Sequence, residues 1–219
     1  MLNLLQLWLR YPLCWLGLKR LGRYDDAEAI IALAFGRQKV TDENLGQVAI
    51  FRQRFGQANG ANHQAIDALC QKGFDPGRLN YKLATEVQKT MARGRRSCYL
   101  QWEVAAALDP DWYQLNWRWI KVIWPQPGSI ELSARDLLLA IKDEVAKRQE
   151  KSAAIIAHQG MIVRAALLVK RQLGLEPIIP EQDVAEFDRD SVQPWTRRRR
   201  SWLWRETRCR IHHLLHRWI

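Results

Sequence analysis

The chain has 219 residues, of which 47% are hydrophobic and 26% are charged, and its formal net charge is +11 at pH 7. These values are ordinary for a globular protein that fills its own core, and the length fits one domain or one domain with a tail. No apolar run reaches the roughly 18–20 residues that a membrane-spanning helix needs. A zinc ribbon and a CxxC redox motif are excluded because the cysteines lie far apart, at Cys14, Cys70, Cys98 and Cys209.

Cysteines this isolated are typical of small buried side chains in a reducing compartment. The sequence therefore predicts a cytoplasmic protein, and the character of its two ends leaves membrane association open. The N-terminal segment lacks the basic region and the cleavage site of a signal peptide. Leu2, Leu5 and Leu9 instead predict an amphipathic first helix, which packs either on the next helix or into a lipid interface.

Helical rather than alternating periodicity runs through most of the chain. Good helix formers after Asp26 predict a helix that includes Ile31 and Leu33. We expect the Asp109-Pro110 pair to end a later helix, because Pro disfavours helical geometry in the residue before it. Apolar residues at helical spacing predict further helices around Val48, Phe51 and Phe55; Ala65 to Leu69; Leu83, Val87 and Met91; Leu100, Val104 and Leu108; and Trp112, Leu115, Trp119 and Ile123.

Two longer helices are predicted in the C-terminal half. Ser133 and Asp136 resemble a capping box that opens a helix to about residue 150. A second, apolar-rich helix is predicted over about residues 153–173, with Gly174 and Pro177 ending it. No segment predicts a strand, so the expected fold class is all-α.

A repeat is indicated by two Asp-Pro pairs, at 75–76 and 109–110, which lie thirty-four residues apart. Each pair is expected to close a helix, and thirty-four is the period of the tetratricopeptide repeat, a helix–turn–helix unit. Cys98, Trp102 and Ala105 precede the second pair where that family has small, bulky and small residues. The chain therefore resembles a tetratricopeptide-repeat protein.

The resemblance covers about residues 10–110 and implies antiparallel helical hairpins stacked as a short solenoid, with a groove for a peptide or a partner helix. A non-repetitive helical bundle is the alternative. The predicted organisation is a helical-repeat domain over 1–174, an acidic, Pro-containing linker over 175–195 and a basic tail helix over 196–219.

Motifs that carry chemistry are few. The segment around His158 resembles one half of a histidine-phosphatase signature, in which a strand that ends in His-Gly precedes a helix. The half that supplies the phosphorylated nucleophile is missing, and Gln159 separates His158 from Gly160. We therefore expect His158 to be a polar residue on a helix, and we interpret lone acids such as Glu103 and Glu144 as parts of solvated faces.

No glycine-rich phosphate loop occurs in the sequence. His212 and His216 stand one helical turn apart, with His213 between them, but only Cys209 accompanies them as a further metal ligand at similar spacing. Exposed imidazoles are the expected outcome. The sequence thus predicts no catalytic residue, no metal and no cofactor, and it predicts a protein that is not an enzyme.

The C-terminal segment from Trp195 to Ile219 holds eight Arg, four Trp and a single acid, Glu206. On a helix, Trp204, Ile211 and Trp218 fall on one apolar face, which predicts a basic amphipathic helix. The residues expected to contact an anionic lipid surface or a nucleic acid are Arg197, Arg198, Arg199, Arg200, Arg205, Arg208, Arg210, Arg217, Trp202, Trp204 and Trp218.

Three interpretations of this tail stay open. It can lie on an anionic membrane surface, bind nucleic acid through phosphate contacts and base stacking, or pack on the scaffold and cap the array. The resulting prediction is a protein–protein interaction scaffold with an unknown protein or peptide partner, held at an anionic membrane surface by its tail. The alternatives are a nucleic-acid-binding protein and a non-catalytic subunit of an enzyme complex.

Overall fold

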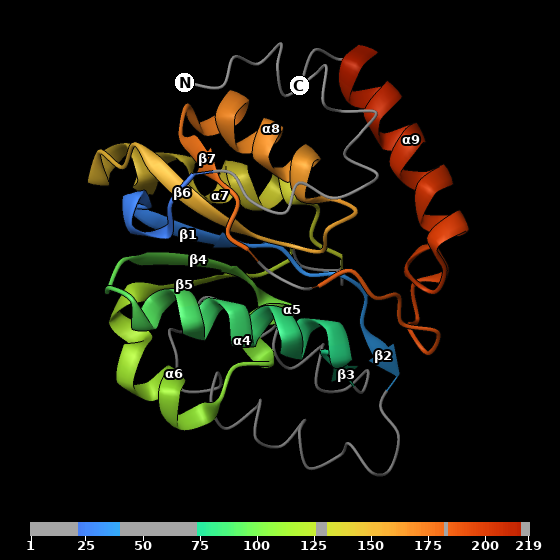
Figure 1. The fold of residues 1–219 in the computed structure, drawn as a ribbon, viewed down its shortest axis with the longest axis horizontal. Coiled ribbons are helices and arrows are strands. Elements are labelled where there is room, and N and C mark those ends of the chain that lie inside the picture. The colour runs from blue at the N-terminus through green and yellow to red at the C-terminus, as the bar shows by residue number, and fades with distance from the viewer. Residues whose placement is uncertain (1–21, 40–73, 126–130, 182–183, 216–219) are drawn as a thin grey trace.

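The computed structural model describes residues 22–39, 74–125, 131–181 and 184–215. These residues form a three-layer α/β sandwich around a parallel sheet (Figure 1). The five strands of the sheet are β1 (Ala29–Ala32), β4 (Ser97–Gln101), β5 (Ile120–Ile123), β6 (Ser152–Ile156) and β7 (Glu176–Ile178).

The strand order in the sheet is β5-β4-β1-β6-β7, and every neighbouring pair is parallel. The first strand in the chain is therefore central, with Ile30 level with Cys98 on one side and with Ala154 on the other. The chain builds outward from β1 in one direction and then in the other. This is a doubly wound topology, whose order reverses between β1 and β6.

Helices cover both faces of the sheet, because the connections between parallel strands cross over its faces. In Figure 1, one face carries the three helices α4 (Arg78–Ala92), α5 (Trp102–Ala106) and α6 (Pro110–Asn116). The opposite face carries α7 (Ala134–Arg148) and α8 (Ile162–Leu173). The remaining elements are the short antiparallel pair β2 (Gln38–Lys39) and β3 (Phe74–Asp75), the 3-10 turns η2 (Tyr24–Asp26), η4 (Trp117–Trp119) and η5 (Pro194–Thr196), and the tail helix α9 (Arg199–Leu215).

The prediction of an all-α, tetratricopeptide-like solenoid was wrong, because the core of the molecule is this parallel sheet. Strands β1, β4 and β6 are buried at every position. A strand that is covered on both faces reads as a continuous apolar run without alternation. Runs of four or five such residues cannot be told from a buried helix by periodicity alone.

Four of the predicted helices contain a strand. The helix predicted to include Ile31 and Leu33 is the strand β1 instead. The stripe from Trp112 to Ile123 begins in α6 and ends in β5. The helix predicted over 153–173 consists of β6, a loop through Gly160 and the shorter helix α8. The stripe that begins at Leu100 starts in β4 and continues only briefly as α5. In the last two cases, the apolar residues of a strand and of the helix that follows it happen to fall at a helical spacing.

The Asp-Pro pairs of the supposed repeat do not close helices. Asp109 is the N-cap of α6, where its carboxylate accepts a 2.8 Å bond from the Trp112 amide, and Pro110 is the first helical residue. Proline is favoured there because that position needs no amide hydrogen. Asp75 lies in β3 and accepts a bond from the Gly77 amide at 2.6 Å, in a turn where Gly77 has φ 83°. The second pair begins a helix and the first forms the turn before one.

Other local predictions are confirmed. The Leu83, Val87 and Met91 stripe is the buried face of α4. Ser133 caps α7, since its hydroxyl accepts a 3.1 Å bond from the Asp136 amide. Gly174 ends α8 with a left-handed φ of 72°.

The predicted helices around Leu2, Val48 and Ala65 lie outside the described residues, as do Cys14 and Cys70. The predicted linker over 175–195 begins with a strand of the sheet, β7. No helix in the described part of the chain is both long enough and apolar enough to cross a bilayer.

Candidate functional site

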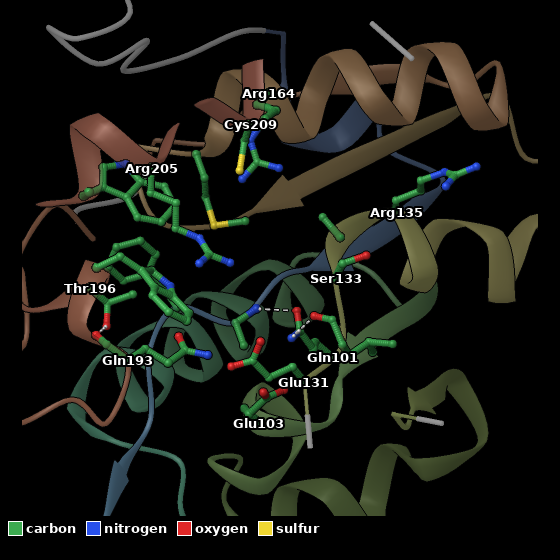
Figure 2. A pocket seen from close by; sticks show the side chains of 18 of the residues that line it. Gln101, Glu103, Glu131, Ser133, Arg135, Arg164, Gln193, Thr196, Arg205 and Cys209 are labelled. Carbon is green, nitrogen blue, oxygen red and sulfur yellow. Dashed lines mark hydrogen bonds between the residues drawn. The ribbon is translucent and has the colours of Figure 1, made fainter. Parts of the chain in front are cut away.

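A cavity of about 460 Å³ lies at the carboxyl edge of the sheet. Its walls come from the segments that follow β1 and β4, from the loop before α7, from the start of α8, and from η5 and α9 (Figure 2). In doubly wound sheets, ligands bind in the crevice outside the carboxyl ends of the strands, beside the point where the strand order reverses. The volume also falls within the range of small-molecule sites.

Gln101 ties the loops of this edge together. This last residue of β4 accepts a 3.1 Å bond from the Ala34 amide through Oε1 and donates a 3.0 Å bond from Nε2 to the Leu132 carbonyl. The loop after β1 and the loop before α7 are thereby held to the central strands. A buried side-chain amide in this role positions backbone and leaves the cavity floor rigid.

Glu103 is the most unusual residue of the site. It lies in the first turn of α5 and is only 3% exposed, and its Oε2 has no hydrogen-bond partner among the described residues. Burial raises the pKa of this carboxyl to about 8, although hydrogen bonds to its own amide and to Gln101 and the charge of Arg37 act in the opposite direction. The nearby charge of Glu131 adds to the increase. At neutral pH, Glu103 is therefore predominantly a neutral acid with a proton to donate.

The opposite wall is formed by the C-terminal segment. Arg205 of α9 stacks over the Trp195 ring, with its guanidinium carbon 3.6 Å from the ring centroid. Figure 2 shows this guanidinium and the side-chain amide of Gln193 directed toward the middle of the cavity. A cation on an aromatic face keeps its N–H edges available for an anion.

A buried ion pair holds α9 against the body. Arg164 of α8 donates from Nε to both carboxylate oxygens of Glu206 at 3.0 Å, and the Glu206 side chain is only 3% exposed. One turn before Glu206, Trp202 is buried against Phe35, with ring centroids 4.7 Å apart. The inner face of α9 is therefore part of the protein core.

Gly160 makes this docking possible. A Cβ atom at this position would lie 2.5 Å from Nε1 of Trp202, closer than two non-bonded atoms can approach. The absence of a side chain between β6 and α8 thus provides the space for the indole.

His158 has a structural role. It stacks on Phe35 with ring centroids 3.7 Å apart, its Nδ1 accepts a 3.0 Å bond from the Gly160 amide, and its Nε2 lies 2.8 Å from the Glu186 carbonyl. Burial lowers the pKa of the imidazole to about 4. Both ring nitrogens are engaged, so His158 lacks the free nitrogen that a phosphorylated nucleophile needs, and it lies just after a strand instead of on the predicted helix.

Several polar groups of the cavity lining make no side-chain hydrogen bond within the described residues, among them Glu103 Oε2, the Gln193 amide, the Arg205 guanidinium and Nε1 of Trp202. By contrast, Ser133 is engaged in capping α7, and Thr196 donates to Ser191 at 2.7 Å. A neutral acid, an amide and a cation around one cavity can bind a small anionic molecule and transfer a proton to it.

The predicted contact residues of the tail divide into two groups. Arg197, Arg198, Arg199, Arg200, Arg205, Arg208 and Trp204 are exposed, whereas Trp202 is buried in the core. Arg217 and Trp218 lie outside the described residues, as does the side chain of Arg210. His212 is exposed, His216 is not described, and no cluster of three metal-binding side chains occurs in the described ranges.

Glu103 was interpreted from the sequence as part of a solvated face, and that interpretation was wrong. A lone acid in a run of apolar residues, Trp102 to Leu108, is the one signal that could have marked it. Glu144 lies at the surface of α7, where it pairs with Lys121 and Arg148. Comparison of the chain with protein-family models, with curated proteins and with solved structures found no match.

Proposed function

We propose that the protein binds a small anionic molecule in the cavity at the carboxyl edge of the sheet and catalyses a reaction on it in which Glu103 donates a proton. The observation that carries this proposal is the buried carboxyl of Glu103, a residue that lines the cavity and whose Oε2 has no hydrogen-bond partner among the described residues. A perturbed acid in a cleft is typical of a catalytic site. Arg205 and Gln193 supply the contacts that would orient the anion.

This proposal differs from the expectation of a non-enzymatic scaffold. The scaffold was inferred from a helical array, and the described residues form a doubly wound sheet in its place. A doubly wound sheet offers a site at its edge instead of a concave face of stacked helices. Binding of a protein or peptide partner stays a prediction without a surface assigned to it.

Cys209 provides a direct test of binding. This half-buried, free thiol lines the cavity, whereas the free thiol of Cys98 is buried in the sheet. We expect a sugar phosphate, a nucleoside monophosphate or a dicarboxylate from a screening panel to slow alkylation of Cys209, as followed peptide by peptide with mass spectrometry. The same compound should raise the melting temperature by mass action, which corresponds to about 2.7 kcal/mol at a hundredfold excess over Kd.

Two variants assign the effect to the cavity. Arg205→Leu should abolish the protection, whereas Arg208→Leu, an exposed arginine of the same helix that does not line this cavity, should retain it. Glu103→Gln should retain binding and lose turnover of the compound that protects. Protection that survives Arg205→Leu, or turnover that survives Glu103→Gln, would show that these residues do not have the proposed roles.

A further inference from the structure

Helix α9 has two faces of opposite character. Trp202, Glu206 and Cys209 form its inner face and pack on the body. On the outer face, Trp204 is 70% exposed and Ile211 is 52% exposed, at a spacing of seven that brings them to the same side. Figure 1 shows α9 lying along one side of the molecule, outside the three layers of the sandwich. One face of the helix thus packs on the body of the protein, and the opposite face is exposed to solvent.

The exposed charged residues of α9 and of the turn before it are all positive within the described residues. Arg197, Arg198, Arg199 and Arg200 are exposed at the start of the helix, and Arg208 is exposed one turn after Trp204. The only acid of the segment is Glu206, which is buried and neutralised by Arg164. The segment therefore supplies no second acid that could neutralise Arg198, Arg200 or Arg208.

A second hollow, of about 700 Å³, opens between η5 and this outer face. Two indoles, Trp195 and Trp204, line it together with Arg205, Arg208 and His212, and no acidic residue is among its described lining residues. Aromatic rings beside guanidinium groups suit a phosphate that is attached to an apolar body.

We propose that the outer face of α9 docks on an anionic phospholipid membrane, with Trp204 and Ile211 at the headgroup boundary and the arginines on lipid phosphates. Charge complementarity favours an anionic partner. The exposed Ile211 favours a membrane over a nucleic acid, because an aliphatic side chain gains nothing from a phosphate backbone but is buried in a lipid interface. The docking needs no detachment of α9, since Trp202 and Glu206 remain in the core.

The same helix then connects the membrane to the cavity. Trp195, Arg205 and Cys209 line both the cavity and the hollow. Docking of the outer face therefore places the cavity close to the headgroup plane.

The test is cosedimentation of the full chain with vesicles of phosphatidylcholine alone and of phosphatidylcholine mixed with phosphatidylglycerol. We expect binding to the mixed vesicles only. The double variant Arg200→Glu/Arg208→Glu, at the two exposed arginines one turn before and after Trp204, should lower the partition coefficient by about tenfold or more, since each arginine near such a surface contributes favourably. Trp204→Ala should lower it several-fold without changing the melting temperature, because its ring is exposed.

Matched controls come from another surface of the molecule. Trp117 is 57% exposed on η4 beside Arg118, so Trp117→Ala removes an exposed indole elsewhere. Arg95→Glu/Arg118→Glu changes the net charge by the same amount at two exposed positions outside α9. Both controls should bind the mixed vesicles as the native chain does.

Three results would overturn the proposal. They are equal binding to both kinds of vesicle, equal losses in the α9 variants and their controls, and no vesicle binding at all. Tight binding of a single-stranded RNA oligonucleotide that depends on Arg200 and Arg208, together with no vesicle binding, would assign the surface to nucleic acid instead.

Discussion

Two walls of the cavity each bury a glutamate, but the surroundings of the two carboxyl groups are opposite. Glu206 on the α9 wall receives two bonds from Arg164, whereas Glu103 on the α5 wall leaves Oε2 without a hydrogen-bond partner in the described structure. A buried charge with its counter-ion holds two elements together. A buried carboxyl without one keeps its proton, and it is available for chemistry. The two side chains are equally buried, but Glu206 holds two elements together, whereas Glu103 is a candidate for chemistry.

The largest effect is expected at the paired glutamate. Arg164→Leu removes the arginine that donates two bonds to the buried Glu206 carboxylate and should lower the free energy of unfolding by about 3–5 kcal/mol in urea denaturation. Arg171→Leu, which removes an exposed arginine of the same helix, should change it little. The double variant Arg164→Leu/Glu206→Leu should recover most of the loss. A loss as small as that of the control would mean that the pair does not hold α9.

The buried carboxyl of Glu103 should make the free energy of unfolding depend on pH. Between about pH 4.5 and pH 8, the folded protein holds a proton on Glu103 that the unfolded chain has released. The free energy of unfolding therefore falls as pH rises through this window, by at most about 1.4 kcal/mol per pH unit from this group. Glu103→Gln removes this contribution, so the variant should gain stability relative to the native chain from pH 5 to pH 8.

Asp143→Asn, at an exposed acid of α7, is the control for this titration and should follow the native pH profile. Parallel profiles of Glu103→Gln and the native chain would show that the Glu103 carboxyl titrates normally. The proposed acid role would then lose its basis.

The contact between Gly160 and Trp202 tests how closely α9 is docked. Gly160→Ala forces the indole of Trp202 or the backbone to move and should cost about 1–3 kcal/mol, measured by thermal unfolding. Gly94→Ala should cost less, since its Cβ would meet only the end of the Arg96 side chain, which can shift at the expense of its bond to the Ala27 carbonyl. If the clash is the cause, Gly160→Ala should cost much less in a Trp202→Leu background.

The smallest expected effect lies at the start of α7, beside the Glu103 wall. Ser133→Ala removes the hydroxyl that caps this helix and should lower the free energy of unfolding by about 1 kcal/mol in urea. Ser201→Ala, at an exposed serine of α9, serves as the comparison and should have no measurable effect. Equal stabilities of the two variants would show that the Ser133 cap does not contribute.

Local residue patterns predicted several helices and helix ends correctly, but they predicted none of the strands. The Ser133 cap, the Gly174 terminus and the Leu83, Val87 and Met91 stripe all depend on residues within a few positions of one another. The strand Ala29–Ala32 has no signal of its own, because both of its faces are covered and alternation is lost. A four-residue apolar run of this kind becomes a strand only beside β4 and β6.

The candidate site could not be predicted from the sequence either, because its environment depends on residues that are distant from one another along the chain. Glu103, Gln193 and Arg205 are spread over about half of the chain, and only the topology of the sheet brings them around one cavity. The environment of Glu103 is set by neighbours that are distant in sequence. Its protonation therefore cannot be derived from its own segment.

In the tail, the sequence and the tertiary structure determine different properties. The order of residues within the segment predicted a basic helix rich in tryptophan, because charge and helical spacing are properties of consecutive residues. Which of its tryptophans is available to a partner was decided by the tertiary structure. Trp202 fits the space left by Gly160, whereas Trp204 points away from the body because two residues on a helix lie about 200° apart.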